Sequence, residues 1–106
     1  MSTSKDKIVN KRANDPIDKL IFEGGLRIKS VWFDRDLDLI IVLLTNKKLL
    51  KRPLSDFQKL ASATDGQLRQ FENEGTGVSW PELDEDLSLR GFLTYELAKM
   101  DAPLFV

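Results

Sequence analysis

A dense group of carboxylates stands in the last quarter of the sequence: Glu82, Asp84, Glu85 and Asp86. Carboxylate oxygens are ligands that Mg²⁺ and Ca²⁺ prefer, and such a site would suit a metal-dependent hydrolase. The spacing does not match an EF-hand loop, and no glycine stands where that loop turns. Acids just before a helix also accept hydrogen bonds from its free N–H groups, and we favour Asp84 or Asp86 as such a cap. We therefore expect no metal and no other cofactor.

A second cluster is basic and consists of Lys47, Lys48, Lys51 and Arg52. The phosphates of nucleic acids are bound by patches of this kind. However, no aromatic residue is interleaved with the cluster, and charged hairpin tips commonly protect a sheet edge from pairing with another chain. A nucleic-acid-associated regulator is therefore the alternative hypothesis for function, and we expect nucleic acid not to be the main partner.

The composition excludes several enzyme classes. The 106 residues contain no histidine and no cysteine, which removes Ser-His-Asp and Cys-His catalysis, disulfides and most zinc sites. Neither Ser79 nor Ser88 has a histidine to activate it. The absence of cysteine suits a reducing compartment, so we expect a cytoplasmic, non-enzymatic protein. The N-terminus lacks the apolar core of a signal peptide, and the longest apolar run, Leu39–Leu44, is too short to span a membrane.

Two apolar features indicate contacts with other chains. Trp80 and Pro81, with the four acidic residues that follow, form the candidate partner-binding segment, because tryptophan dominates interface hot spots. A tryptophan in a short strand is more often core, and we favour the core for Trp80 and also for Trp32, which has apolar neighbours on both sides. The segment Leu104, Phe105 and Val106 is costly to expose, so we expect it in a homodimer interface or folded back on its own domain.

The length fits one domain, and the polar residues 1–14 indicate a mobile tail before a single α+β domain over residues 15–106. We predict a small antiparallel sheet, made of a hairpin plus a short strand, packed with two or three helices. The central strand of the hairpin is nearly all apolar, which predicts cover on both of its faces. The predicted strands are 26–33, 37–45, 49–52 and 78–80, and the predicted helices are 16–22, 54–61, a helix opened by a Thr64–Gln67 capping box, and 87–100, which Pro103 ends.

The segment Val78–Leu93 contains Trp-Pro-Glu-Leu-Asp-Glu-Asp, followed by a hydroxyl residue and a Gly-Phe-Leu helix start. It resembles the signature of the prokaryotic family called domain of unknown function 2442. The resemblance extends over about residues 27–94, although members often have an Asp-Gly hairpin turn where this chain has Asn46-Lys47. It implies a small α+β fold and a bacterial setting beside other small proteins, and it brings no catalytic residues.

These observations favour an accessory protein-binding module that presents a surface to a small protein partner. The family resemblance suggests a partner encoded nearby, in the manner of toxin–antitoxin pairs. The nucleic-acid-associated regulator comes second. A metal-dependent hydrolase built on Asp84, Glu85 and Asp86 comes third.

Overall fold

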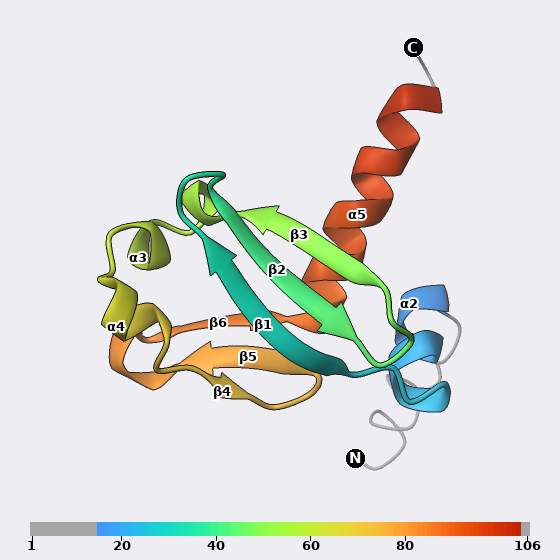
Figure 1. The fold of residues 1–106 in the computed structure, drawn as a ribbon. Coiled ribbons are helices and arrows are strands. Elements are labelled where there is room, and N and C mark those ends of the chain that lie inside the picture. The colour runs from blue at the N-terminus through green and yellow to red at the C-terminus, as the bar shows by residue number, and fades with distance from the viewer. Residues whose placement is uncertain (1–14, 105–106) are drawn as a thin grey trace, which may run out of the picture.

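The apolar run Leu39–Leu44 forms β2, the central strand of an antiparallel three-stranded sheet. The structure is a computed structural model that describes residues 15–104, with side chains to residue 100. The hairpin predicted from the sequence is confirmed, because β2 pairs antiparallel with β3. The other neighbour of β2 is β1, so the sheet has the order β1-β2-β3. We call it the first sheet (Figure 1). Its outer strands are β1, Ile28–Asp34, and β3, Leu49–Pro53.

A second three-stranded sheet, with the order β4-β5-β6, lies where a single short strand was expected. The predicted strand at Trp80 is confirmed as β5, and it is the central strand of this sheet. No strand or helix was predicted for the acidic stretch 82–86, but its second half belongs to β6. Asp84 adopts a left-handed conformation with φ 52° after a 3-10 turn, so the chain reverses and runs back along β5. The strands are β4, Glu72–Asn73, β5, Gly77–Trp80, and β6, Glu85–Ser88.

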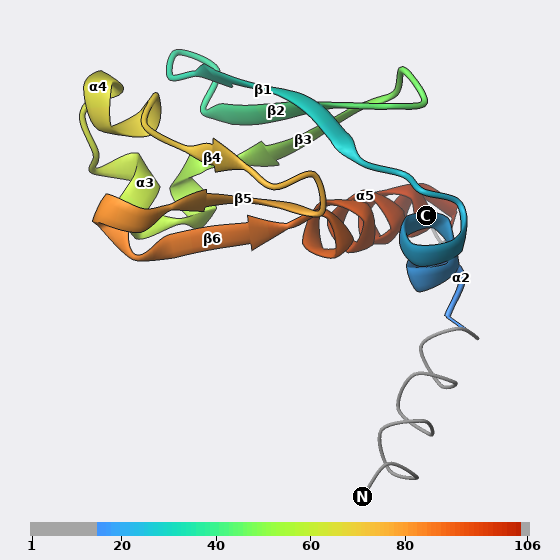
Figure 2. The same cartoon turned by 90° about the horizontal axis from the view of Figure 1, so that it is seen from below.

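The two sheets form two layers, with the helices at the ends (Figure 2). Helices α3 and α4 close one end, and α2 and the start of α5 lie at the other. The core fills the space between the layers, where Ile40 and Val42 of the first sheet and Val78 and Trp80 of the second are almost fully buried. The helices are α2, Pro16–Asp18, α3, Gln58–Ala61, α4, Asp65–Leu68, and α5, Leu89–Leu104, with a π-helical turn at Lys19–Glu23 and 3-10 turns at Leu54–Asp56 and Pro81–Leu83.

Side-chain hydrogen bonds cap the starts of α4 and α5. The Thr64–Gln67 capping box is confirmed at α4. Helix α5 begins at Leu89, two residues later than predicted, and the hydroxyl of Ser88 accepts a hydrogen bond from the Gly91 N–H at 2.9 Å. The proposed cap at Asp84 or Asp86 was therefore wrong. None of the helices in residues 15–104 is long and apolar enough to cross a membrane.

An ion pair attaches α2 to α5. The carboxylate of Asp15 lies 2.6 Å from the Arg90 guanidinium, and Asp18 lies 3.8 Å from it. Asp15 is also the cap of α2, because its side chain accepts the Ile17 N–H at 2.8 Å. The Ile17 N–H and, after it, Arg90 lower the pKa of Asp15 against the opposing effect of burial. Helix α2 is thus fastened to α5.

Two burial expectations for the sheet were wrong. Trp32 is 49% exposed, because its neighbours Val31 and Phe33 point inward and alternation along a strand turns the residue between them outward. Strand β2 is central, as predicted, but only Ile40, Val42 and Leu44 are buried on it, while the residues between them are half-buried. Among residues 15–104 the sheet is therefore covered on one face and not on both.

The end of α5 also differs from the prediction. Leu97 is 48% exposed, and all residues from Leu97 to Met100 are exposed. Pro103 was expected to lie beyond the helix, yet the helix continues to Leu104. Because this part of α5 is surrounded by solvent, the carbonyl that loses its hydrogen-bond partner at proline is accessible to water.

The hairpin turn between β2 and β3 holds a lysine in a conformation that suits glycine. Lys47 has φ 74°, and its N–H donates to the Leu44 carbonyl at 2.9 Å. A residue with a side chain loses about 1–2 kcal/mol of stability in this left-handed backbone conformation, and glycine avoids that loss. Part of the gain is offset because glycine has more conformational freedom in the unfolded chain. We expect Lys47→Gly to raise the free energy of unfolding by about 0.5–1 kcal/mol, measured by urea denaturation. Lys48→Gly, at a residue without positive φ, is the control and should bring no gain; equal effects would contradict the turn geometry.

Candidate functional site

The side of the first sheet that points away from the second sheet has an apolar surface, which we call the open face. Trp32, Ile41 and Lys51 form one row across the three strands, and Leu43 and Leu49 are paired in the next row. Residues directly opposite each other in antiparallel strands share a face. Figures 1 and 2 show no helix or strand of residues 15–104 over this side. The open face consists of Trp32, Leu39, Ile41, Leu43, Leu49 and Lys51.

The exposure of the open face sets it apart from an ordinary surface. Trp32 and Leu49 are 49% and 56% exposed, and the apolar residues of β2 between them are only half-buried. Single exposed apolar side chains are common, whereas a contiguous patch commonly marks an interaction site. Tryptophan at such a patch is typical of interface hot spots. The open face is therefore the strongest candidate site of this molecule.

A groove of about 630 Å³ runs along the free edge of β1 and reaches the open face at Trp32. Phe33 and Phe71 are among its apolar lining residues, and their rings meet edge to face with centroids 5.9 Å apart. Arg69 also lines the groove. The groove extends the open face around the edge of the first sheet.

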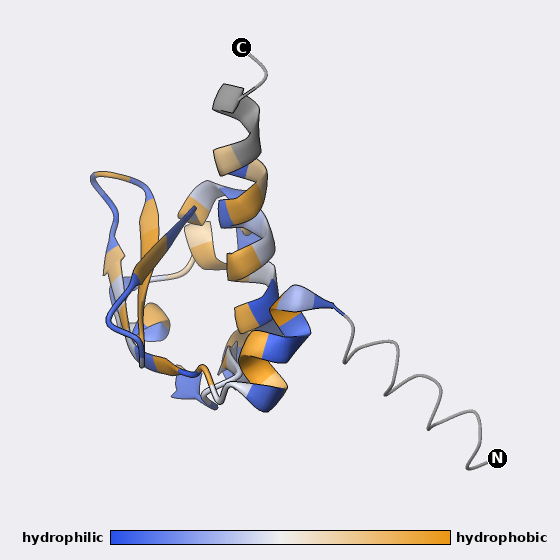
Figure 3. Ribbon diagram, turned by 90° about the vertical axis from the view of Figure 1, so that its right-hand side faces the viewer, coloured by the Kyte–Doolittle hydropathy of each residue, from blue (hydrophilic) through white to orange (hydrophobic). Residues whose placement is uncertain are grey.

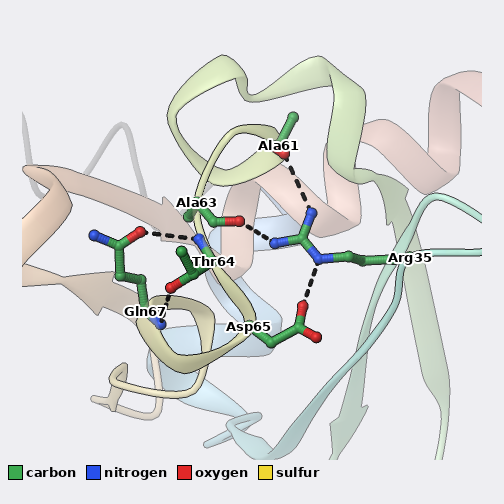
Figure 4. Close-up of polar contacts among 6 residues, drawn as sticks. All are labelled: Arg35, Ala61, Ala63, Thr64, Asp65 and Gln67. Carbon is green, nitrogen blue, oxygen red and sulfur yellow. Dashed lines mark hydrogen bonds and ion pairs between the residues drawn. The ribbon is translucent and has the colours of Figure 1, made fainter.

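Arg35 connects the turn after β1 to the end of α3 and the start of α4 (Figure 4). Its guanidinium donates to the Asp65 carboxylate at 2.6 Å, to the Ala61 carbonyl at 3.2 Å and to the Ala63 carbonyl. A planar fork with several donors can satisfy three acceptors at once. Because these hydrogen bonds join Arg35 to residues around α3 and α4, it acts as a structural clamp at the end of the groove.

The predicted acidic segment does not form one site. Trp80 is 1% exposed, so it cannot be a surface anchor, and the core interpretation holds. Asp84 lies 3.9 Å from Lys59, while Asp86 stands on β6 opposite Ser79. Within residues 15–104, no three acidic side chains come together in an arrangement that could hold a metal ion. The segment Trp80, Pro81, Glu82, Asp84, Glu85 and Asp86 is thus divided between the core, a turn and a strand.

The basic cluster is also divided. Lys47 and Lys48 lie in the hairpin turn, Lys51 lies on the open face, and Arg52, the next residue of the strand, points to the other side. The Arg52 guanidinium carbon lies 4.7 Å from the ring centre of Phe57, 5.7 Å from that of Phe92 and 5.0 Å from that of Tyr95. The Arg52 charge is therefore held among aromatic rings and does not add to the patch of lysines.

The third candidate, the C-terminal segment, lies almost entirely outside the described residues. Leu104 is the last residue of α5, and Phe105 and Val106 follow it. Its role in self-association stays a prediction.

Sequence reasoning missed the open face. The signal was present in the alternation along the strand: once Ile40, Val42 and Leu44 are assigned to the core, Leu39, Ile41 and Leu43 must face outward. The pairing of β1 and β3 with β2 places Trp32 and Leu49 on the same face. The sequence alone does not give this pairing, so these two residues could not be assigned to the face from it.

Comparison with known proteins gives a family and no activity. A family model described as "Protein of unknown function (DUF2442)" matches residues 28–98. No curated protein matches the sequence. A solution structure of an uncharacterized protein from Chromobacterium violaceum is 36% identical with a TM-score of 0.55, and the match covers 64% of each chain. A crystal structure of a protein of unknown function from Rhodospirillum rubrum is 35% identical with a TM-score of 0.55, covering 65% of this chain and 86% of that one.

Proposed function

The chain belongs to the DUF2442 family of proteins of unknown function, and from its own surfaces we propose that it is a non-enzymatic accessory module that binds another protein through the open face. The observation that carries the proposal is the apolar character of this face, which no described element covers. A partner with an apolar surface would remove Trp32, Ile41 and Leu49 from water. The function of the family itself is unknown, so the proposal depends on this surface.

We propose a cytoplasmic protein of a prokaryote whose partner is a small protein encoded nearby, in the manner of toxin–antitoxin pairs. The relatives of known structure come from bacteria. We also propose that the chain is a homodimer, so that one assembly presents two open faces.

The two alternative functions have less support. A nucleic-acid-associated regulator would use Lys47, Lys48, Lys51 and Arg52, but Arg52 lies on the opposite side of β3 from Lys51. A metal-dependent hydrolase would need the carboxylates of Asp84, Glu85 and Asp86 to converge, and among the described residues they do not. The open face, in contrast, is a single continuous surface on paired strands.

A photo-crosslinking amino acid placed at the open face tests the proposal in cells. With p-benzoylphenylalanine at Ile41, we expect a discrete crosslinked product with one protein, because the face is buried in the complex. The matched control carries the same group at Asp86, an exposed position on the second sheet, and should give no such product. We expect Trp32→Ser with Leu49→Ser to leave the far-ultraviolet spectrum unchanged and to weaken binding of that partner at least tenfold. Equal crosslinking from both positions would contradict the proposal.

A further inference from the structure

The second half of α5 stands clear of both sheets (Figures 1 and 3). Leu89 and Phe92, near the start of the helix, are buried in the core, whereas every residue from Leu97 to Met100 is exposed. In proteins, most of the stability of a helix comes from packing of its apolar face, and a short helical stretch on its own is marginal in water. This part of α5 therefore lacks the packing that its own domain would have to supply.

The exposed part of α5 continues an apolar stripe that begins against the core. Leu93 is half-buried, and Leu97 and Met100 follow at steps of four and three residues. Position 104, another leucine of the helix, adds a further step of four. Alternating steps of four and three are the spacing of a coiled-coil seam, in which each side chain fits between residues of a second helix. Leu97 and Met100 are 48% and 57% exposed, so the seam is open to a partner.

We infer that the partner at this seam is the α5 helix of a second copy of the chain, packed antiparallel about a two-fold axis that passes between Leu97 and Met100. The inference rests on the homodimer proposed above and not on the partner of the open face. A two-fold axis at this point places Leu97 of each helix beside Met100 of the other, so the seam matches itself.

The charged residues beside the seam favour the antiparallel orientation. A parallel pair would set Glu96 of one helix against position 101 of the other, which is an aspartate. In the antiparallel pair, Glu96 lies on the flank that also carries Lys99 of the opposite helix. Within its own chain Lys99 lies 5.6 Å from the Tyr95 ring centre, and its flexible side chain can turn from there toward Glu96 of the opposite helix. Charge repulsion therefore disfavours the parallel pair and not the antiparallel one.

Sedimentation and light scattering test the interface. A seam of this length buries less than the roughly 800 Å² per partner of a standard interface, so dimerisation is expected in the micromolar range. We expect the intact chain to be a dimer at 100 µM and Leu97→Glu with Met100→Glu to be a monomer. The control, Ala98→Glu with Ala102→Glu, adds the same charge to α5 away from the seam and should remain dimeric.

The absence of native cysteine allows the orientation to be tested by crosslinking. A mixture of Leu97→Cys and Met100→Cys chains should form a mixed disulfide faster than either chain links to itself, because only the mixed pair is adjacent in the antiparallel dimer. Faster self-linking of Leu97→Cys would overturn the orientation. A monomeric intact chain would overturn the homodimer itself, and a dimer that survives Leu97→Glu with Met100→Glu would overturn the interface. None of these results depends on crosslinking at the open face, so the two proposals can fail separately.

Discussion

Replacing Trp80 with alanine is expected to lower the free energy of unfolding by about 3–5 kcal/mol, because a large side chain would leave a cavity between the two sheets. Trp80 is 1% exposed, and its ring lies 6.2 Å from the rings of Phe33 and Phe71. Its indole N–H also donates to the buried Leu68 carbonyl at 3.0 Å. Small domains are stable by only about 5–15 kcal/mol, so this one substitution removes a large part of the total.

The chain has its own control for this experiment in its second tryptophan. Trp32→Ala removes the same side chain from a half-exposed position, and we expect a loss of no more than about 1 kcal/mol. Urea denaturation followed by circular dichroism measures both without relying on tryptophan fluorescence. If Trp80→Ala does not fold, Trp80→Phe keeps most of the volume and isolates the hydrogen bond, at about 1–3 kcal/mol. Equal losses at Trp80 and Trp32 would contradict the arrangement of the two layers.

Arg52→Met is expected to cost about 2 kcal/mol, which is large for a residue near the protein surface. Its guanidinium lies within 5.7 Å of the ring centres of Phe57, Phe92 and Tyr95, and partly desolvated cation–π contacts contribute up to about 2 kcal/mol. The buried Nε has no hydrogen-bond partner within the described part of the chain, which reduces the net gain. We expect Arg52→Lys to recover only part of the loss, because an ammonium cannot stack flat on a ring.

Lys51→Met is the matched control, since it removes a charge from the neighbouring residue on the open face. Its effect on the free energy of unfolding should stay within about 0.5 kcal/mol. Thermal and urea denaturation of the three variants give the comparison. If Lys51→Met were as costly as Arg52→Met, the contact of Arg52 with the start of α5 would not be the source of the effect.

Local signals in the sequence predicted the elements that depend on nearby residues. The hairpin of β2 and β3, the Thr64–Gln67 capping box and the short strand at Trp80 are all confirmed. Strand β6 was missed because two of its residues, Glu85 and Asp86, are acidic, and only pairing with β5 makes them a strand. A charged residue at the edge of a sheet carries little local preference, so tertiary pairing decides its structure.

The difference between local signals and tertiary pairing also explains why the predicted sites differ from the observed ones. Lys51 and Arg52 are equivalent as sequence letters, but a strand sends consecutive side chains to opposite faces. Trp32 was assigned to the core because of its apolar neighbours. Side chains alternate between the two faces of a strand, so Trp32 points to the opposite face from Val31 and Phe33. The open face could therefore be predicted as a set of outward positions on β2, while its extent required the pairing of all three strands.

The strand order also bears on how the chain folds. Each sheet has its strands in sequence order, β1-β2-β3 and β4-β5-β6, so every pairing joins a strand to the next one along the chain. No strand is shared between the sheets. They are joined at Ile28, whose carbonyl accepts from the Asn73 side chain at 3.0 Å and whose N–H donates to the Gly75 carbonyl at 2.7 Å. Folding rates fall as contacts become more distant in sequence, because long loops must be closed before their contacts can form. Each three-stranded sheet can thus form from local hairpins, and we expect the contacts between the two layers around Trp80, which are distant in sequence, to form last.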